Sequence, residues 1–138
     1  MKKKVFAAGI LLAAVAVALF LLLRPGPPPA SLRVLVDGQA LSSPVLSPEK
    51  DGLRVILTLD GAEIADLPFS EPHTVRILQK SGDENTVLLT GSSVRMESAN
   101  CDGQDCVKME EITRDNLETC VMQGMIICLP HRLCVEVR

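Results

Sequence analysis

Sulfur is the element with which this sequence could do chemistry. Thiols can form disulfides, hold a metal ion or carry electrons, depending on the redox state of their compartment. Their chemistry therefore depends on the elements that position them and on the side of a membrane on which they lie. All five cysteines lie in the last third of the chain: Cys101, Cys106, Cys120, Cys128 and Cys134.

Cys101 and Cys106 form the first candidate pair. In an ideal helix, residues i and i+5 lie beyond the roughly 7 Å Cα separation that a disulfide allows. A disulfide between them therefore needs a compact loop, which Gly103 permits. If the segment is instead helical from Asp102, Cys106 faces elsewhere and Cys128 becomes a possible partner. Both pairings remain open, and these three cysteines are the candidate disulfide or redox residues.

A metal site is the second possibility. The candidate zinc ligands are Cys101, Cys106, Cys128 and His131, but no C-x-x-C pair of a standard structural zinc site is present. His131 follows a proline, and the simplest interpretation is an exposed ring. Covalent haem is disfavoured because C-x-x-C-H is absent. We expect no metal and no other cofactor.

Nucleophilic redox chemistry would need a thiol of low pKa. The surroundings of Cys101 and Cys106 are acidic and should raise the thiol pKa, with only Lys108 opposing them. A thioredoxin-like role is therefore disfavoured, although a slow regulatory disulfide remains open. The acidic residues are Asp102, Asp105, Glu110 and Glu111.

An odd number of cysteines leaves at least one thiol unpaired within a single chain. In the run 132–137, Cys134 alternates with apolar residues and so lies on the polar face. Cys134 and Cys120 are the candidate free thiols, and either could link two chains.

No G-x-S-x-G, P-loop, H-E-x-x-H or complete EF-hand motif occurs, and His73 and His131 are the only imidazoles. We expect no enzymatic activity.

The N-terminus predicts a membrane anchor. Residues 5–23 carry no charge and are long enough to cross a bilayer core. They run into Arg24 and a proline cluster without an A-x-A cleavage site, which favours an uncleaved signal anchor over a cleaved signal peptide. Three lysines in residues 1–4 keep that end in the cytoplasm. The chain is then a single-pass cell-membrane protein, with a Pro-rich linker (24–31) and an extracellular domain (32–138).

The predicted outer domain is acidic and aliphatic. Ten Lys and Arg residues against 17 acidic residues follow Pro25, a net charge of −7. A nucleic-acid-binding domain needs a basic face and usually aromatic side chains for stacking. Phe69 is the one aromatic residue after the linker. Nucleic acid is therefore excluded as a partner.

The hydrophobic pattern of this domain is that of short strands. Runs of alternating or apolar residues are closed by Asp37-Gly38 and Asp60-Gly61, which are hairpin turn signals. The pattern predicts an all-β fold, a small barrel or sandwich of about 6–8 short strands with one short helix within residues 102–112. The runs are 32–36, 53–59, 73–80, 86–90, 92–97, 121–129 and 132–137.

Two sequence blocks resemble a known family. An N-C-x4-C-V-K block (100–108) and a C-L-P-H block (128–131), with an early V-D-G (36–38), resemble the NusG domain II-like family. The resemblance implies a compact β-fold behind one membrane helix in Gram-positive bacteria, with no established activity. It implies that Cys101, Cys106 and Cys128 follow the family pattern, while Cys120 and Cys134 are additional. Residues 110–125 look longer than the family's connection, so the register between the two blocks can differ.

We therefore expect a membrane-tethered, extracytoplasmic, non-catalytic β-domain that binds an envelope protein or wall component. It is not a transcription factor, since no other transcription-factor module is present. The alternative is an accessory role in extracytoplasmic thiol redox or electron transfer through the cysteine pair. A structural zinc domain is a third hypothesis.

Overall fold

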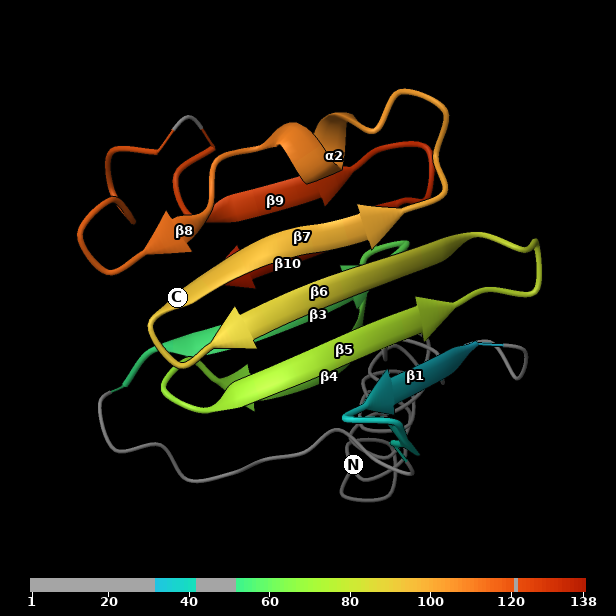
Figure 1. Ribbon diagram of the computed structural model, residues 1–138, viewed down its shortest axis with the longest axis horizontal. Helices are drawn as coiled ribbons and strands as arrows, with labels where there is room; N and C mark the ends of the chain where they lie inside the picture. The colour runs from blue at the N-terminus through green and yellow to red at the C-terminus, as the bar shows by residue number, and fades with distance from the viewer. Residues whose placement is uncertain (1–31, 42–51, 121) are drawn as a thin grey trace, which may run out of the picture.

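The protein is a sandwich of two antiparallel sheets, seen here in a computed structural model. The structure describes residues 32–41, 52–120 and 122–138. The predicted N-terminus (1–4), anchor (5–23) and linker (24–31) lie outside these ranges, and their boundaries stay predictions. Among the described residues, no helix has the length and apolarity to cross a membrane. Figure 1 shows the six-stranded sheet in front of the four-stranded sheet.

The first sheet has the strand order β2-β1-β5-β6-β7-β8. Its central strands alternate buried side chains with half-buried or exposed ones, so that one face covers the second sheet and the other is turned toward solvent. Its strands are β1 (Arg33–Val36), β2 (Gln39–Ala40), β5 (Pro72–Leu78), β6 (Glu84–Thr90), β7 (Ser93–Ala99) and β8 (Ile112–Thr113).

The second sheet has the order β4-β3-β10-β9. The last strand of the chain, β10, lies inside this sheet and pairs with both β3 and β9. The short helix α2 (Asp105–Lys108) packs against β7 and β9, and so connects the two sheets at one edge (Figure 1). The strands are β3 (Arg54–Leu59), β4 (Ala62–Pro68), β9 (Met125–Cys128) and β10 (Leu133–Val137).

Both predicted Asp-Gly turns are confirmed. Asp37 and Gly38 have φ of 51° and 82°, and Asp60 and Gly61 have 52° and 79°. Two successive positive φ angles match the twist of the flanking strands, and Asp and Gly are among the residues that adopt them most easily. The turns join β1 to β2 and β3 to β4.

The all-β prediction with one short helix is confirmed, but the predicted strand count was too low. The described residues form ten strands, and β4 and the two-residue strands β2 and β8 were missed. In β4 the adjacent residues Ile64 and Ala65 are both buried, and a register shift interrupts its pairing with β3. A bulge of this kind breaks the two-residue period by which a strand is recognised. The predicted run 121–129 is also shorter, because β9 begins at Met125.

The core between the sheets is almost entirely aliphatic. Val55, Leu57 and Leu59 of β3 are buried in it, and Leu53, just before that strand, is half-buried against it. Phe69 is fully buried, and the guanidinium of Arg114 lies 5.2 Å from its ring centroid. The core therefore contains the Phe69 ring, which the Arg114 guanidinium covers.

Candidate functional site: a cluster of three cysteines

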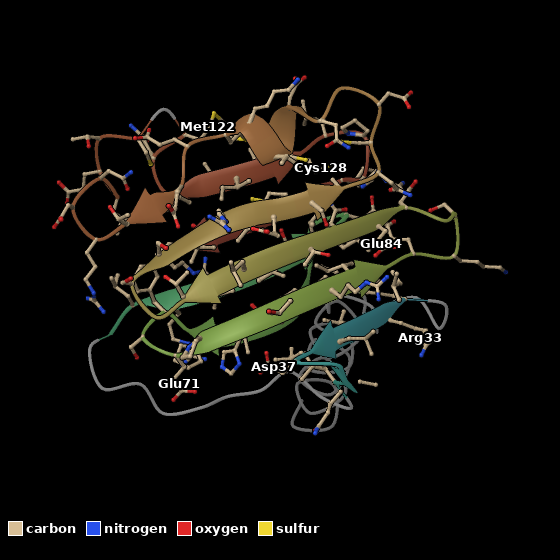
Figure 2. All side chains as sticks on the ribbon, viewed as in Figure 1. Arg33, Asp37, Glu71, Glu84, Met122 and Cys128 are labelled. Atoms are coloured by element: carbon tan, nitrogen blue, oxygen red, sulfur yellow. The ribbon has the colours of Figure 1, made fainter. Side chains whose placement is uncertain are left out.

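Three cysteines from separate parts of the chain meet beside α2. Cys101 follows the end of β7, Cys106 lies in α2, and Cys128 is the last residue of β9. All three are buried, and their Sγ atoms lie within 4.8 Å of one another. Figure 2 shows Cys128 at the end of β9, directly below the helix. We call this group the three-cysteine cluster.

A tight loop before α2 brings the first two thiols together. Gln104 has φ of 56°, a left-handed conformation, and the helix begins at the next residue. The Gln104 side chain donates hydrogen bonds to the carbonyls of Ala99 and Cys101. The loop therefore folds back on the end of β7 and places Cys106 Sγ 3.7 Å from Cys101 Sγ.

The structure thus combines the two predicted arrangements. The loop is compact, as a Cys101–Cys106 pair requires, and the later start of the helix still leaves Cys106 beside Cys128. All five thiols are unbonded. A separation of 3.7 Å is that of a weak S–H···S hydrogen bond, well beyond the roughly 2.05 Å of a disulfide bond.

Burial makes the central thiol a weak acid. The pKa of Cys106 is raised to about 12, mainly by burial and then by hydrogen bonds with Cys128 and Cys101. The acidic neighbours predicted to raise a thiol pKa are not among the causes; Asp105, for example, points into solvent with its side chain 91% exposed. Because the thiolate is the nucleophile, Cys106 in this state is unreactive near neutral pH.

His131 lies apart from the cluster and is not exposed. Its ring is 4% accessible, and Nδ1 lies 2.7 Å from Oδ1 of the fully buried Asn85. Its Nε2 lies 3.7 Å from a carboxylate oxygen of Asp83. These contacts hold the ring between the β9–β10 turn and β6. Sequence reasoning missed the buried Asn85, because a polar residue near a strand start carries no signal of burial, and it missed the half-exposed Asp83 in the loop before β6.

The two additional cysteines occupy different surroundings. Cys120 is buried, and its sulfur accepts a hydrogen bond from the Gly124 backbone N–H at 3.0 Å. Cys134 is half-exposed on β10, on the polar side that its alternation predicts. Burial raises the pKa of Cys134, and the nearby carboxylate of Glu136 adds to this. Neither sulfur belongs to the three-cysteine cluster.

A small hollow opens from the three-cysteine cluster toward the surface. It has a volume of about 80 Å³ and lies between the loop before α2 and the β9–β10 turn. Leu129 and Pro130 of that turn line it, together with Gly103 and Gln104. Leu129 is 79% exposed, the one large hydrophobic side chain among the described residues that is exposed to this degree. We call this feature the Leu129 hollow.

Comparison with known proteins agrees with this fold. A DUF1312 family protein from Enterococcus faecalis V583 is 25% identical, with a TM-score of 0.54 over 62% of this chain and 95% of that chain. The Lin0431 protein from Listeria innocua is 24% identical, with a TM-score of 0.52 over 62% of this chain and 94% of its own. No curated protein matches the chain. The model of the family described as NusG domain II matches residues 7–138, and the chain belongs to that family.

Proposed function

We propose that this chain is a membrane-tethered, extracytoplasmic, non-catalytic domain that binds another envelope protein at the Leu129 hollow. The observation that carries the proposal is the exposure of Leu129 at the edge of a concave surface that also includes Pro130. An exposed leucine next to a recess offers apolar area that a partner side chain can cover. The exposed carboxylate of Asp105 lines the hollow, and the exposed Asp102 lies in the loop before α2, which favours a partner with basic groups.

The tether is supported by the sequence. Residues 5–23 are apolar and uncharged, and the family match begins at residue 7, within this segment. Lysines on the N-terminal side favour an outward orientation of the domain. In this arrangement the Pro-rich linker holds the sandwich close to the outer leaflet.

The proposal of a non-catalytic domain is supported by the contacts of the side chains that could act in catalysis. His73 lies between Asp37, 2.8 Å from Nδ1, and Glu71, 3.5 Å from Nε2. His131 is enclosed by Asn85 and Asp83, and Cys106 is buried with a raised pKa. None of these groups is arranged as a nucleophile with an adjacent base.

The test is site-specific photo-crosslinking of the full chain in bacterial membranes. A photoreactive residue at position 129 should give one dominant adduct with a membrane or wall-associated protein. The matched control is position 63, because Glu63 is also exposed but lies on the edge strand β4. The chain should stay in the membrane fraction after an alkaline carbonate wash. Equal adducts from both positions would contradict the binding surface, and release by carbonate would contradict the tether.

A second candidate function, thiol redox, is favoured by the 3.7 Å contact between Cys101 and Cys106. Oxidation would join the two Sγ atoms and release two protons and two electrons to an extracytoplasmic disulfide or quinone acceptor. Incubation of the full chain in glutathione redox buffers, followed by alkylation and peptide mass mapping, tests this. A reversible change confined to these two thiols supports the redox function. Thiols that do not change across the buffer series exclude it.

A further inference from the structure

The three-cysteine cluster has the composition of a soft-metal site. Its three donors are all sulfur, all buried, and gathered within 4.8 Å by β7, α2 and β9. We propose that Cys101, Cys106 and Cys128 bind one thiophilic d10 metal ion, copper(I) or zinc(II), as thiolates. This inference shares the Leu129 hollow with the proposed function, but it does not require a protein partner there.

The spacing of the sulfur atoms fits a single ion. Bonds of about 2.3 Å from a metal to three thiolates place the sulfurs about 4.0 Å apart in a plane, and about 3.8 Å apart in a tetrahedron. The Cys101–Cys106 separation is 3.7 Å, and no pair exceeds 4.8 Å. An ion can therefore be held after small shifts of the three cysteine side chains, without rearrangement of the strands.

The type of donor restricts the ion. Thiolates select soft ions such as copper(I) and zinc(II) over magnesium, calcium and manganese, which prefer oxygen. Copper(I) is satisfied by three sulfur ligands, whereas zinc(II) needs a fourth. Among the described residues His131 is not that ligand, because its ring is engaged by Asn85 and Asp83. For zinc(II), the fourth position would fall to a water or an outside ligand in the adjoining hollow.

The Leu129 hollow supplies the path by which an ion reaches the buried sulfurs. It is lined by all three cysteines and, beside them, by Gly103 and Pro130. Each thiol that becomes a ligand loses its proton, which passes to solvent, so binding is accompanied by proton release. Only the reduced cluster has three such ligands, because a Cys101–Cys106 disulfide would remove two of them.

Titration of the reduced full chain in mild detergent, under anaerobic conditions, tests the site. Copper(I) is supplied in one arm from a bathocuproine disulfonate buffer, and zinc(II) in the other from a chromophoric chelator. The chain has no Trp or Tyr, so the ultraviolet charge-transfer band of a metal thiolate is not obscured by aromatic absorption. The variants are Cys101→Ser, Cys106→Ser and Cys128→Ser. The matched controls are Cys120→Ser and Cys134→Ser.

We expect one ion per chain that resists the chelator in at least one arm. Each cluster variant should lose affinity by more than the roughly 10–100-fold that outer-shell substitutions cost. The two controls should bind as the unaltered chain does. The arm with the tighter binding identifies the ion. No chelator-resistant binding in either arm, or binding that survives Cys106→Ser, overturns the proposal.

A second measurement on the unaltered chain covers the case of variants that do not fold. Iodoacetamide labelling under mild denaturant, followed by mass mapping, should show that the bound ion protects Cys101, Cys106 and Cys128. Cys134, half-exposed on β10, should label at the same rate with and without the ion. Equal labelling of the three cluster thiols with and without metal overturns the proposal.

Discussion

The buried contact between Asn85 and His131 should be among the most important polar contacts for stability. Asn85 is the second residue of β6 in the first sheet, and His131 lies in the β9–β10 turn of the second sheet. Both side chains are buried, and the Asn85 Oδ1 to His131 Nδ1 distance is 2.7 Å. Because a carboxamide oxygen only accepts, Nδ1 donates its proton across the two sheets. The Asn85→Ala substitution removes that acceptor.

The magnitude follows from what remains after the substitution. Its partner, His131, stays buried with an N–H that has lost its acceptor, which costs about 1–3 kcal/mol of the free energy of unfolding. For a domain of about 100 residues, this corresponds to a fall in melting temperature on the order of 10 °C. The Asn85 Nδ2 also lies 3.6 Å from Met96 Sδ, but this weak contact adds little.

A double-mutant cycle isolates the pair from the packing around it. Urea unfolding of the reduced domain, followed by far-ultraviolet circular dichroism, is measured for Asn85→Ala, His131→Ala and the double variant. We expect the double variant to be more stable than the sum of the single changes predicts, by about 1 kcal/mol or more. If the two losses add within about 0.5 kcal/mol, the side chains are independent and the reasoning is refuted.

Three further changes test the core, a turn and a surface pair. Phe69→Ala should cost about 3–5 kcal/mol of the unfolding free energy, because it removes the only phenylalanine ring among the described residues from the core; a loss below about 1 kcal/mol would contradict that role. Gly91→Ala should destabilise more than Gly82→Ala in thermal melts, since both have positive φ but only at position 91 does the new Cβ lie 3.0 Å from a backbone carbonyl. Asp37 has a lowered pKa, mainly from its hydrogen bond with His73, so its contribution to stability is complete above its ordinary value of 3.8 and is lost as the pH falls through the lower folded value. Asp37→Asn keeps the turn geometry but removes the charge, so its melting temperature should approach that of the unaltered chain below pH 3.8; a constant difference across this range would contradict the assignment.

Local features of the fold could be predicted from the sequence. The two Asp-Gly turns and the alternation in β10 depend on neighbouring residues, and the structure places them as expected. The strand β4 could not be recognised, because Ile64 and Ala65 face the core in succession at a bulge. The strand order could not be predicted from the sequence either, because the pairing of β10 with β3 joins segments that are far apart in the chain.

The candidate site was predictable in part for the same reason. The spacing of Cys101 and Cys106 restricted their geometry, since only a compact loop brings them into contact. The position of Cys128 beside the other two cysteines depends on how β9 packs against α2, which is a tertiary contact. The environment of His131 depends on Asn85 of a distant strand and carries no local signal. Burial, rather than the charged neighbours visible in the sequence, determines the acidity of Cys106.

The central position of β10 has a consequence for biosynthesis. The second sheet needs β10 between β3 and β9, yet β10 is the last of the described strands to be made. While the ribosome is still producing residues 133–137, β3 and β9 lack their shared neighbour, and the inner face of the first sheet lacks much of its cover. The sandwich can therefore be completed only after this strand emerges.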